Sequence, residues 1–306
     1  MADADQETRP PPDSVGVTGR SWHDDVMTDP TEQEEAQARR FDEWAAGYDR
    51  WWAPVLAPSA HVLLDQLAPA IDAGAVDVLD VGVGTGNLTR PALARWPHIR
   101  VTGLDASREM VGTVEALIAG HSDDHRDRFT GTVSFAGDMP YPDDSFDLAM
   151  SSFVLQLVPS RAKVLREVRR VLRPGGRFAY VTWLVDDRAF KPDRIFDGLL
   201  DEFGFEDEED RPRTGDIPSV ERAIGELRRA GFRDVIGSRA MLDYAYTVES
   251  YIAFLTEFDE VSLFDEMDRP ERRRFLALLR ERLMRLDPDE LRFRVAIVYA
   301  SGVRSG

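Results

Sequence analysis

The chain has no cysteine among its 306 residues. This excludes disulfides, thiolate metal sites and a cysteine nucleophile. Histidine is scarce as well: the five residues show no metal-ligand spacing, and they are His23, His61, His98, His121 and His125. We therefore expect no metal. No run of about eighteen apolar residues occurs, so the sequence predicts no transmembrane helix.

Positive charge is under-represented. The chain has 38 Lys and Arg against 56 Asp and Glu, for a formal net charge of −18. Such a charge opposes non-specific binding to nucleic acid or to an anionic membrane. We therefore expect a small-molecule substrate and no nucleic-acid partner.

The N-terminal 29 residues contain few apolar side chains and are acidic and proline-rich. They lack the basic and apolar regions of a signal peptide. We interpret residues 1–29 as a disordered tail, residues 30–306 as one folded domain, and the protein as cytoplasmic.

The stretch 76–90, V-D-V-L-D-V-G-V-G-T-G-N-L-T-R, organises the rest of the chain. Its apolar start indicates a buried parallel strand, and its end indicates a helix. Three glycines between them allow positive φ and a close approach to a ligand. A dinucleotide fingerprint requires a glycine where Asn87 stands, so the spacing disfavours a dinucleotide cofactor.

A second strand is expected at 99–104 and ends in Asp105, nineteen residues beyond Gly86. An acid at this position suits hydrogen bonds from both ribose hydroxyls of a cofactor. A third strand is expected at 133–138, a fourth at 146–151, a fifth at 178–183 and a sixth at 235–245.

The glycine stretch resembles motif I of the class I S-adenosylmethionine (SAM)-dependent methyltransferases. The segment 41–49, F-D-E-W-A-A-G-Y-D, is similar to the F-D-x-x-A-x-x-Y-D of the ubiquinone/menaquinone-type (type 11/25) small-molecule methyltransferases. D-A-S-R-E-M at 105–110 and L-R-P-G-G at 172–176 match further segments of that family. The resemblance covers roughly residues 36–183.

The resemblance implies SAM as the cofactor. Carried over by position, the cofactor-binding residues are Asp80, Gly82, Gly84, Gly86, Asp105, Ala106, Met110, Asp138, Met139, Ser151 and Tyr48. The resemblance implies that Asp138 accepts a hydrogen bond from the adenine 6-amino group and that Met139 packs on the adenine ring. In this chain the loop after Asp138 is shorter than in the family.

The order of elements predicts an α/β fold, a doubly wound Rossmann-like seven-stranded sheet. Six strands are expected to be parallel, and the last, at 291–300, antiparallel. Segments 30–58, 184–217 and 247–286 are expected to form a helical cap over the substrate. The expected substrate-lining residues are Trp51, Trp52, Gln156, Trp183 and Tyr244.

The implied activity is methyl transfer to a small-molecule acceptor, an aromatic or apolar metabolite, at oxygen, nitrogen or carbon. Two alternatives stay open: a SAM-binding natural-product enzyme without methyl transfer, such as a cyclase or decarboxylase, and a non-catalytic SAM-binding protein. No residue is singled out as a general base; the candidates are Tyr48, His61 and His23. A homodimer also stays open.

Overall fold

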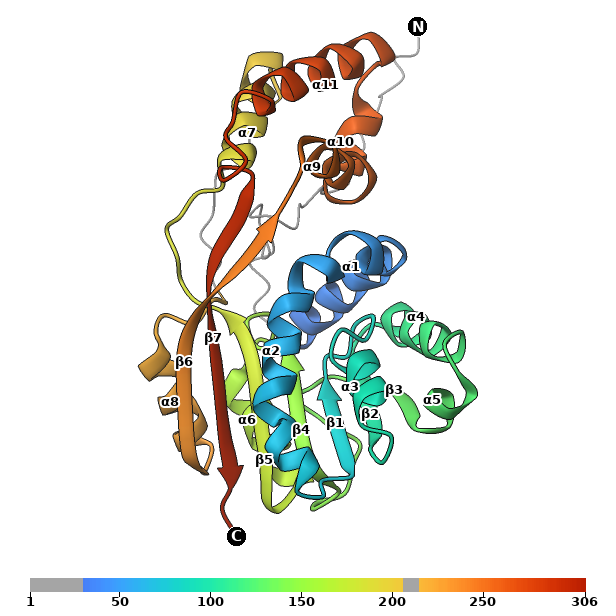
Figure 1. The fold of residues 1–306 in the computed structure, drawn as a ribbon, viewed down its shortest axis with the longest axis vertical. Helices are drawn as coiled ribbons and strands as arrows, with labels where there is room; N and C mark the ends of the chain where they lie inside the picture. Colours follow the sequence, from blue (N-terminus) through green and yellow to red (C-terminus); the bar gives the residue numbers. More distant parts are fainter. Residues whose placement is uncertain (1–29, 206–214) are drawn as a thin grey trace, which may run out of the picture.

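The computed structural model describes residues 30–205 and 215–306. The expected disordered tail therefore lies outside the described residues. A seven-stranded sheet in the order β3-β2-β1-β4-β5-β7-β6 forms its centre (Figure 1). None of the helices in these two ranges combines the length and the apolar character that crossing a membrane requires.

The strands are β1 (Asp77–Val81), β2 (Arg100–Asp105), β3 (Phe129–Val133), β4 (Phe146–Ser152), β5 (Leu172–Trp183), β6 (Phe232–Ala245) and β7 (Arg292–Arg304). The helices are α1 (Pro30–Trp51), α2 (Ala53–Asp72), α3 (Thr89–Arg95), α4 (Arg108–Ala119), α5 (Asp123–Asp127), α6 (Arg161–Val171), α7 (Lys191–Phe203), α8 (Val220–Arg229), α9 (Val248–Phe254), the π-helix η1 (Leu255–Asp259), α10 (Val261–Glu266) and α11 (Arg269–Leu283).

The sheet has the predicted mixed topology. Strands β1 to β5 are parallel to one another, and β7 lies antiparallel between β5 and β6. The carboxyl ends of the parallel strands therefore meet at one edge, where open α/β sheets bind ligands. The expectation of six parallel strands and an antiparallel last strand is confirmed.

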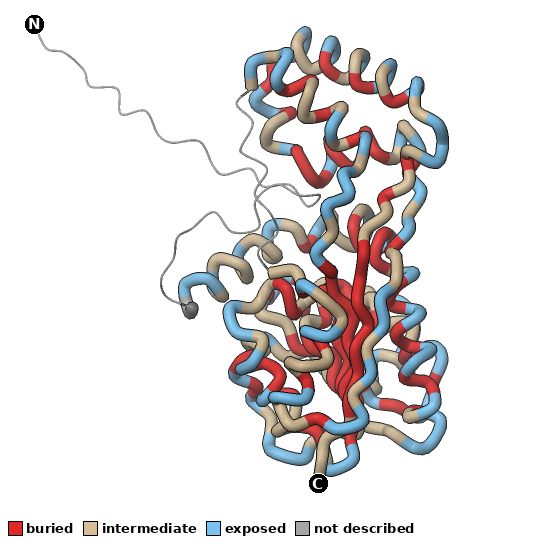
Figure 2. The backbone as a smooth tube through the Cα atoms, turned by 90° about the vertical axis from the view of Figure 1, so that its left-hand side faces the viewer, coloured by how far each residue is buried: buried red, intermediate tan, exposed pale blue. Residues whose placement is uncertain are grey.

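Helices cover both faces of the sheet. Apolar residues of α2, α3 and α4 form one core with one face, and those of α6 and α8 form a second core with the other. Alternate residues of a strand point to opposite faces, so Val78 belongs to the first core and Leu79 to the second. Figure 2 shows the resulting buried sheet between more exposed helices.

Strands β6 and β7 outrun the rest of the sheet and lead into a group of helices formed by α7, α9, η1, α10 and α11 (Figure 1). We call this group the cap helices. Aromatic contacts hold them together, including Phe196 with Phe275 and Phe203 with Phe275. Because their buried residues belong to the same cluster as those of α2, the cap helices share a continuous core with one sheet face.

Three boundaries differ from the expected ones. The third strand spans 129–133 instead of 133–138, because its pairing with β2 ends where Val133 meets Asp105. The fifth strand begins at Leu172 and includes the proline-glycine turn, and the sixth begins at Phe232. Beyond the sixth strand, helix α9 continues as the π-helix η1 from Leu255.

Candidate active site

A cavity lies at the carboxyl edge of β1, β2, β3 and β4 and beneath α1. Its lining combines the glycine turn after β1, the tips of β2 and β3, the loop after β4 and one face of α1. The lining residues are Glu34, Gln37, Ala38, Phe41, Tyr48, Gly82, Gly84, Leu104, Asp105, Ala106, Met110, Phe135, Ala136, Ser152, Phe153, Val154, Leu157, Val158 and Pro159. Six of the eleven predicted cofactor residues are among them.

The three glycines of the turn all have positive φ: +72° at Gly82, +51° at Gly84 and +91° at Gly86. A Cβ on Gly82 would lie 2.2 Å from Val154 Cγ2, so that glycine is required by packing. A Cβ on Gly84 would meet no atom within 4 Å. Gly84 therefore presents bare backbone to the cavity, as close approach of a ligand requires.

Asp105 joins the tips of two strands. Its carboxylate accepts hydrogen bonds from the Gly84 N–H at 2.8 Å and from the Ser107 N–H at 3.0 Å. Burial raises the pKa of Asp105, and these backbone donors oppose the rise. Since a carboxylate has about four acceptor positions, it retains capacity for two hydroxyl donors from a ligand.

Asp80 lies behind the turn and outside the cavity lining. Its side chain is buried and accepts a 2.6 Å hydrogen bond from Thr89 Oγ1, at the start of α3. Burial, with the neighbouring Asp105 carboxylate, raises the pKa of Asp80 to about 7. A nearby cation would favour its ionised form. That Asp80 orients the amino-acid end of the cofactor, directly or through water, stays a prediction.

Helix α1 is fastened over the cavity by two aspartates whose roles the sequence analysis did not identify. Asp42 accepts hydrogen bonds from Ser107 Oγ at 2.5 Å and from the Glu109 N–H at 3.1 Å, at the start of α4. Asp49 forms a 2.6 Å ion pair with Arg90 of α3. Both aspartates belong to the F-D-x-x-A-x-x-Y-D segment, so this motif already indicated the positions that hold α1 in place.

The structure argues against two of the three candidate bases, Tyr48 and His61. Burial and the neighbouring Asp105 carboxylate raise the pKa of Tyr48 well above its ordinary value, so the Tyr48 phenol stays protonated at neutral pH and is a poor general base. His61 lies exposed on α2 and is not among the cavity residues. His23 falls outside the described residues.

Alternation along β4 corrects one predicted cofactor contact. Ser151 is buried and donates its Oγ hydrogen to the Val81 carbonyl at 2.8 Å, which holds two strands together. The next residue, Ser152, faces the cavity instead. Gly86 also lies outside the lining, packed against Val114 and Arg90 of the surrounding helices.

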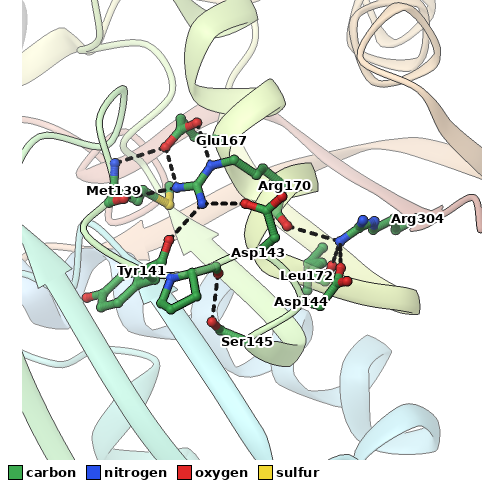
Figure 3. A network of polar contacts seen from close by, with 10 residues as sticks. Met139, Tyr141, Asp143, Asp144, Ser145, Glu167, Arg170, Leu172 and Arg304 are labelled. Carbon is green, nitrogen blue, oxygen red and sulfur yellow. Dashed lines mark hydrogen bonds and ion pairs between the residues drawn. The ribbon is translucent and has the colours of Figure 1, made fainter.

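The predicted adenine residues lie away from the cavity. Asp138 is exposed. Met139 is buried in the second core, and its N–H donates to Glu167 at 3.0 Å while its carbonyl accepts from Arg170 (Figure 3). The cavity wall after β3 is built from Phe135 and Ala136, because the strand already ends at Val133, the first residue of the predicted strand.

The five predicted substrate residues do not line this cavity in the described part of the chain. Gln156 uses its amide internally, toward the Phe153 carbonyl and Thr182 Oγ1. Trp52 packs between aromatic rings of α9 and β7. Trp183 stands directly behind the cavity, with its ring centroid 4.2 Å from that of Phe153.

The other two predicted substrate residues have partners near the cap helices. The Trp51 ring lies under the Arg50 guanidinium, 4.5 Å from the ring centroid, and Tyr244 stands 4.9 Å from Tyr246 between ring centroids. The predicted substrate role of all five stays a prediction about a larger acceptor site.

Buried polar atoms without a partner mark the cavity as a ligand site. Gln37 Nε2 and Ser152 Oγ belong to lining residues, and Thr85 Oγ1 belongs to the glycine turn. Buried polar groups are normally hydrogen-bonded, so unpartnered ones at a cavity indicate that a ligand completes them. The Asp105 carboxylate fits the ribose of SAM, the apolar Met110 fits its base, and the bare backbone at Gly84 fits its amino-acid group.

Comparison with known proteins agrees with this geometry. Residues 79–180 match the family model described as "Methyltransferase domain". The chain is 39% identical over 101 residues to the ubiquinone/menaquinone biosynthesis C-methyltransferase of Geotalea daltonii, covering 33% of this chain and 42% of that protein. It is 32% identical over 174 residues to the 27-O-demethylrifamycin SV methyltransferase of Amycolatopsis mediterranei, covering 52% and 61%.

The chain thus spans about half the length of the curated relatives it matches. Among solved structures, the phosphoethanolamine N-methyltransferase 2 of Haemonchus contortus, in complex with phosphomonomethylethanolamine and S-adenosylhomocysteine, superposes with a TM-score of 0.50 at 17% identity. The superposition covers 81% of this chain and 53% of that one. At this identity the similarity shows a shared fold.

Proposed function

We propose that this chain is a class I SAM-dependent methyltransferase that transfers the SAM methyl group to a small-molecule acceptor. The observation that carries the proposal is the cavity in which Gly84, Asp105 and Met110 meet beneath α1. The matched relatives named for methyl transfer in quinone and rifamycin chemistry support a small-molecule acceptor.

SAM supplies a methyl group on a sulfonium, which is already an excellent leaving group. The contribution of this chain is therefore positioning and exclusion of water. Asp105 accepts the ribose hydroxyls, and the Gly84 backbone permits close approach. Helix α1, tied down by Asp42 and Asp49, closes the cavity from above.

The acceptor proposed here is aromatic or apolar. Phe41 and Phe153 contribute aromatic walls to the cavity, and the Trp183 ring lies behind Phe153 with 4.2 Å between ring centroids. Such apolar walls suit a planar or apolar small molecule. The cap helices reach this region through η1, where Phe258 contacts Tyr48 with 6.4 Å between ring centroids.

The test is incubation with methyl-labelled SAM and a pool of small aromatic acceptors. We expect the label to leave SAM and appear in an acceptor product. Label that stays on SAM while an acceptor is otherwise transformed would favour the cyclase or decarboxylase alternative. SAM binding with no turnover in any pool would favour the non-catalytic alternative.

A further inference from the structure

Helix α1 presents one continuous face to the cavity. The four lining residues Glu34, Gln37, Ala38 and Phe41 recur at helical spacing, and Tyr48 continues the same face two turns later. The helix therefore contributes a row of side chains along the length of the site, in addition to a cover.

The two ends of that row face different parts of the site. Tyr48 stands beside Asp105, the ribose acid at the tip of β2, since that carboxylate contributes to the raised Tyr48 pKa. Glu34 lies two turns before Phe41, at the opposite end of the row, where the charges of Asp138 and Lys163 act on its pKa. Asp138 follows β3 by one turn, with its N–H bonded to the Phe135 carbonyl at 3.0 Å. The Glu34 end of the face therefore lies beyond the ribose position, where the purine belongs.

The walls at this end are apolar and fit a flat ring. They come from α4, from the segment after β3 and from the loop after β4, and are formed by Met110, Phe135, Ala136, Leu157 and Val158. Two polar groups face this apolar space from α1. Gln37 Nε2 is buried with no partner, and the Glu34 carboxyl is half-buried.

Desolvation raises the pKa of Glu34, and Lys163 opposes the rise. A hydrogen-bond donor from a ligand would offset this desolvation. The purine of SAM has such a donor in its 6-amino group, next to an acceptor ring nitrogen. The acid that the sequence analysis assigned to this task, Asp138, is exposed and does not line the cavity.

We propose that α1 reads the purine edge of the cofactor, with Glu34 accepting from the 6-amino group and Gln37 Nε2 donating to the adjacent ring nitrogen. This inference rests on the proposed function, because it assigns a base-specificity role at the same cofactor site. Reading a base by stacking and by hydrogen bonds to its edge is a general mode of purine recognition.

The experiment compares two ligands that differ only at this edge. S-adenosylhomocysteine (SAH) has the 6-amino group, whereas S-inosylhomocysteine has a 6-oxo group and a protonated ring nitrogen. Both are titrated calorimetrically into the full chain. A hydrogen bond to a charged group predicts that the wild-type protein prefers SAH by about 10- to 150-fold.

Glu34→Gln should reduce this preference to the share that Gln37 contributes, because the amide of the new glutamine can donate to a 6-oxo group as well as accept from a 6-amino group. Gln37→Leu should weaken SAH binding by about two- to tenfold. Glu35→Gln is the matched control. Glu35 is adjacent to Glu34 on α1, its side chain is 56% exposed and it pairs with Arg39, so this substitution should not change the preference. Unchanged melting temperatures would show that all variants fold.

Two results would overturn the inference alone: wild-type protein that binds both ligands equally, or Glu34→Gln that keeps the full preference while SAH still binds. If Asp138→Asn lost the preference for SAH while Glu34→Gln kept it, recognition of the purine edge would belong to the segment after β3 instead of α1. Wild-type protein that does not bind SAH at all would overturn the proposed function together with this inference.

Discussion

Replacement of Asp105 by asparagine should separate cofactor binding from folding. The carboxylate accepts the Gly84 and Ser107 backbone N–H groups at 2.8 and 3.0 Å. Asparagine keeps one acceptor oxygen but turns an NH₂ group toward the other donor. One backbone N–H then loses its partner, which lowers the unfolding free energy by about 1–3 kcal/mol.

An effect of opposite sign accompanies this loss. Burial raises the pKa of Asp105, which means that the ligand-free fold disfavours the ionised carboxylate. A neutral amide avoids that desolvation. We therefore expect the net change in unfolding free energy to stay below about 2 kcal/mol.

Cofactor binding has no such compensation. Two ribose hydroxyls that donate to a carboxylate contribute about 1.5–3 kcal/mol each, and asparagine retains one of these bonds at neutral strength. SAH affinity should fall by about 2–4 kcal/mol, roughly 30- to 1,000-fold. Calorimetric titration measures the affinity, and urea denaturation without ligand measures the stability. Asp127→Asn, at an exposed acid of α5, serves as the control. An unchanged SAH affinity in folded Asp105→Asn would refute the ribose assignment.

Two further predictions concern Asp80 and Asp42. Burial raises the Asp80 pKa to about 7, so the ligand-free folded state binds more protons than the unfolded chain between pH 4 and 7. The unfolding free energy should therefore fall as the pH rises through this range, by at most about 4 kcal/mol. Asp80→Asn should flatten this slope in denaturation curves across that range; an identical slope would contradict the buried acid. Asp42→Ala removes the acceptor for Ser107 and Glu109. It should weaken SAH binding about tenfold and speed amide hydrogen exchange in residues 34–48. Glu43 is exposed on the same helix, so Glu43→Ala should have neither effect. Equal protection of α1 in both variants would show that Asp42 does not hold the helix.

Features encoded locally could be predicted from the sequence. The alternation of strands and helices determined the mixed sheet, and the glycine turn with Asp105 located the cavity. These inferences succeed because a strand, its turn and the following helix are contiguous in the chain.

Features that depend on distant pairing could not be predicted in the same way. The end of β3 is determined by its register with β2, and that register moved the cavity wall from Asp138 to Phe135 and Ala136. The choice between Ser151 and Ser152 depends on which face of β4 meets the cavity. The contacts of α1 with α4 join residues 65 and 67 positions apart, beyond the reach of a local pattern.

The central claim is that SAM binds at the Gly84 backbone beneath α1. Titration of SAH into wild-type protein and Gly84→Val tests it most directly, because Gly84 has φ +51° and a Cβ there meets no protein atom within 4 Å. A valine would occupy the ligand's space and strain the backbone. We expect one SAH site per wild-type chain and no detectable binding to folded Gly84→Val. Undiminished SAH binding by the folded variant would contradict it.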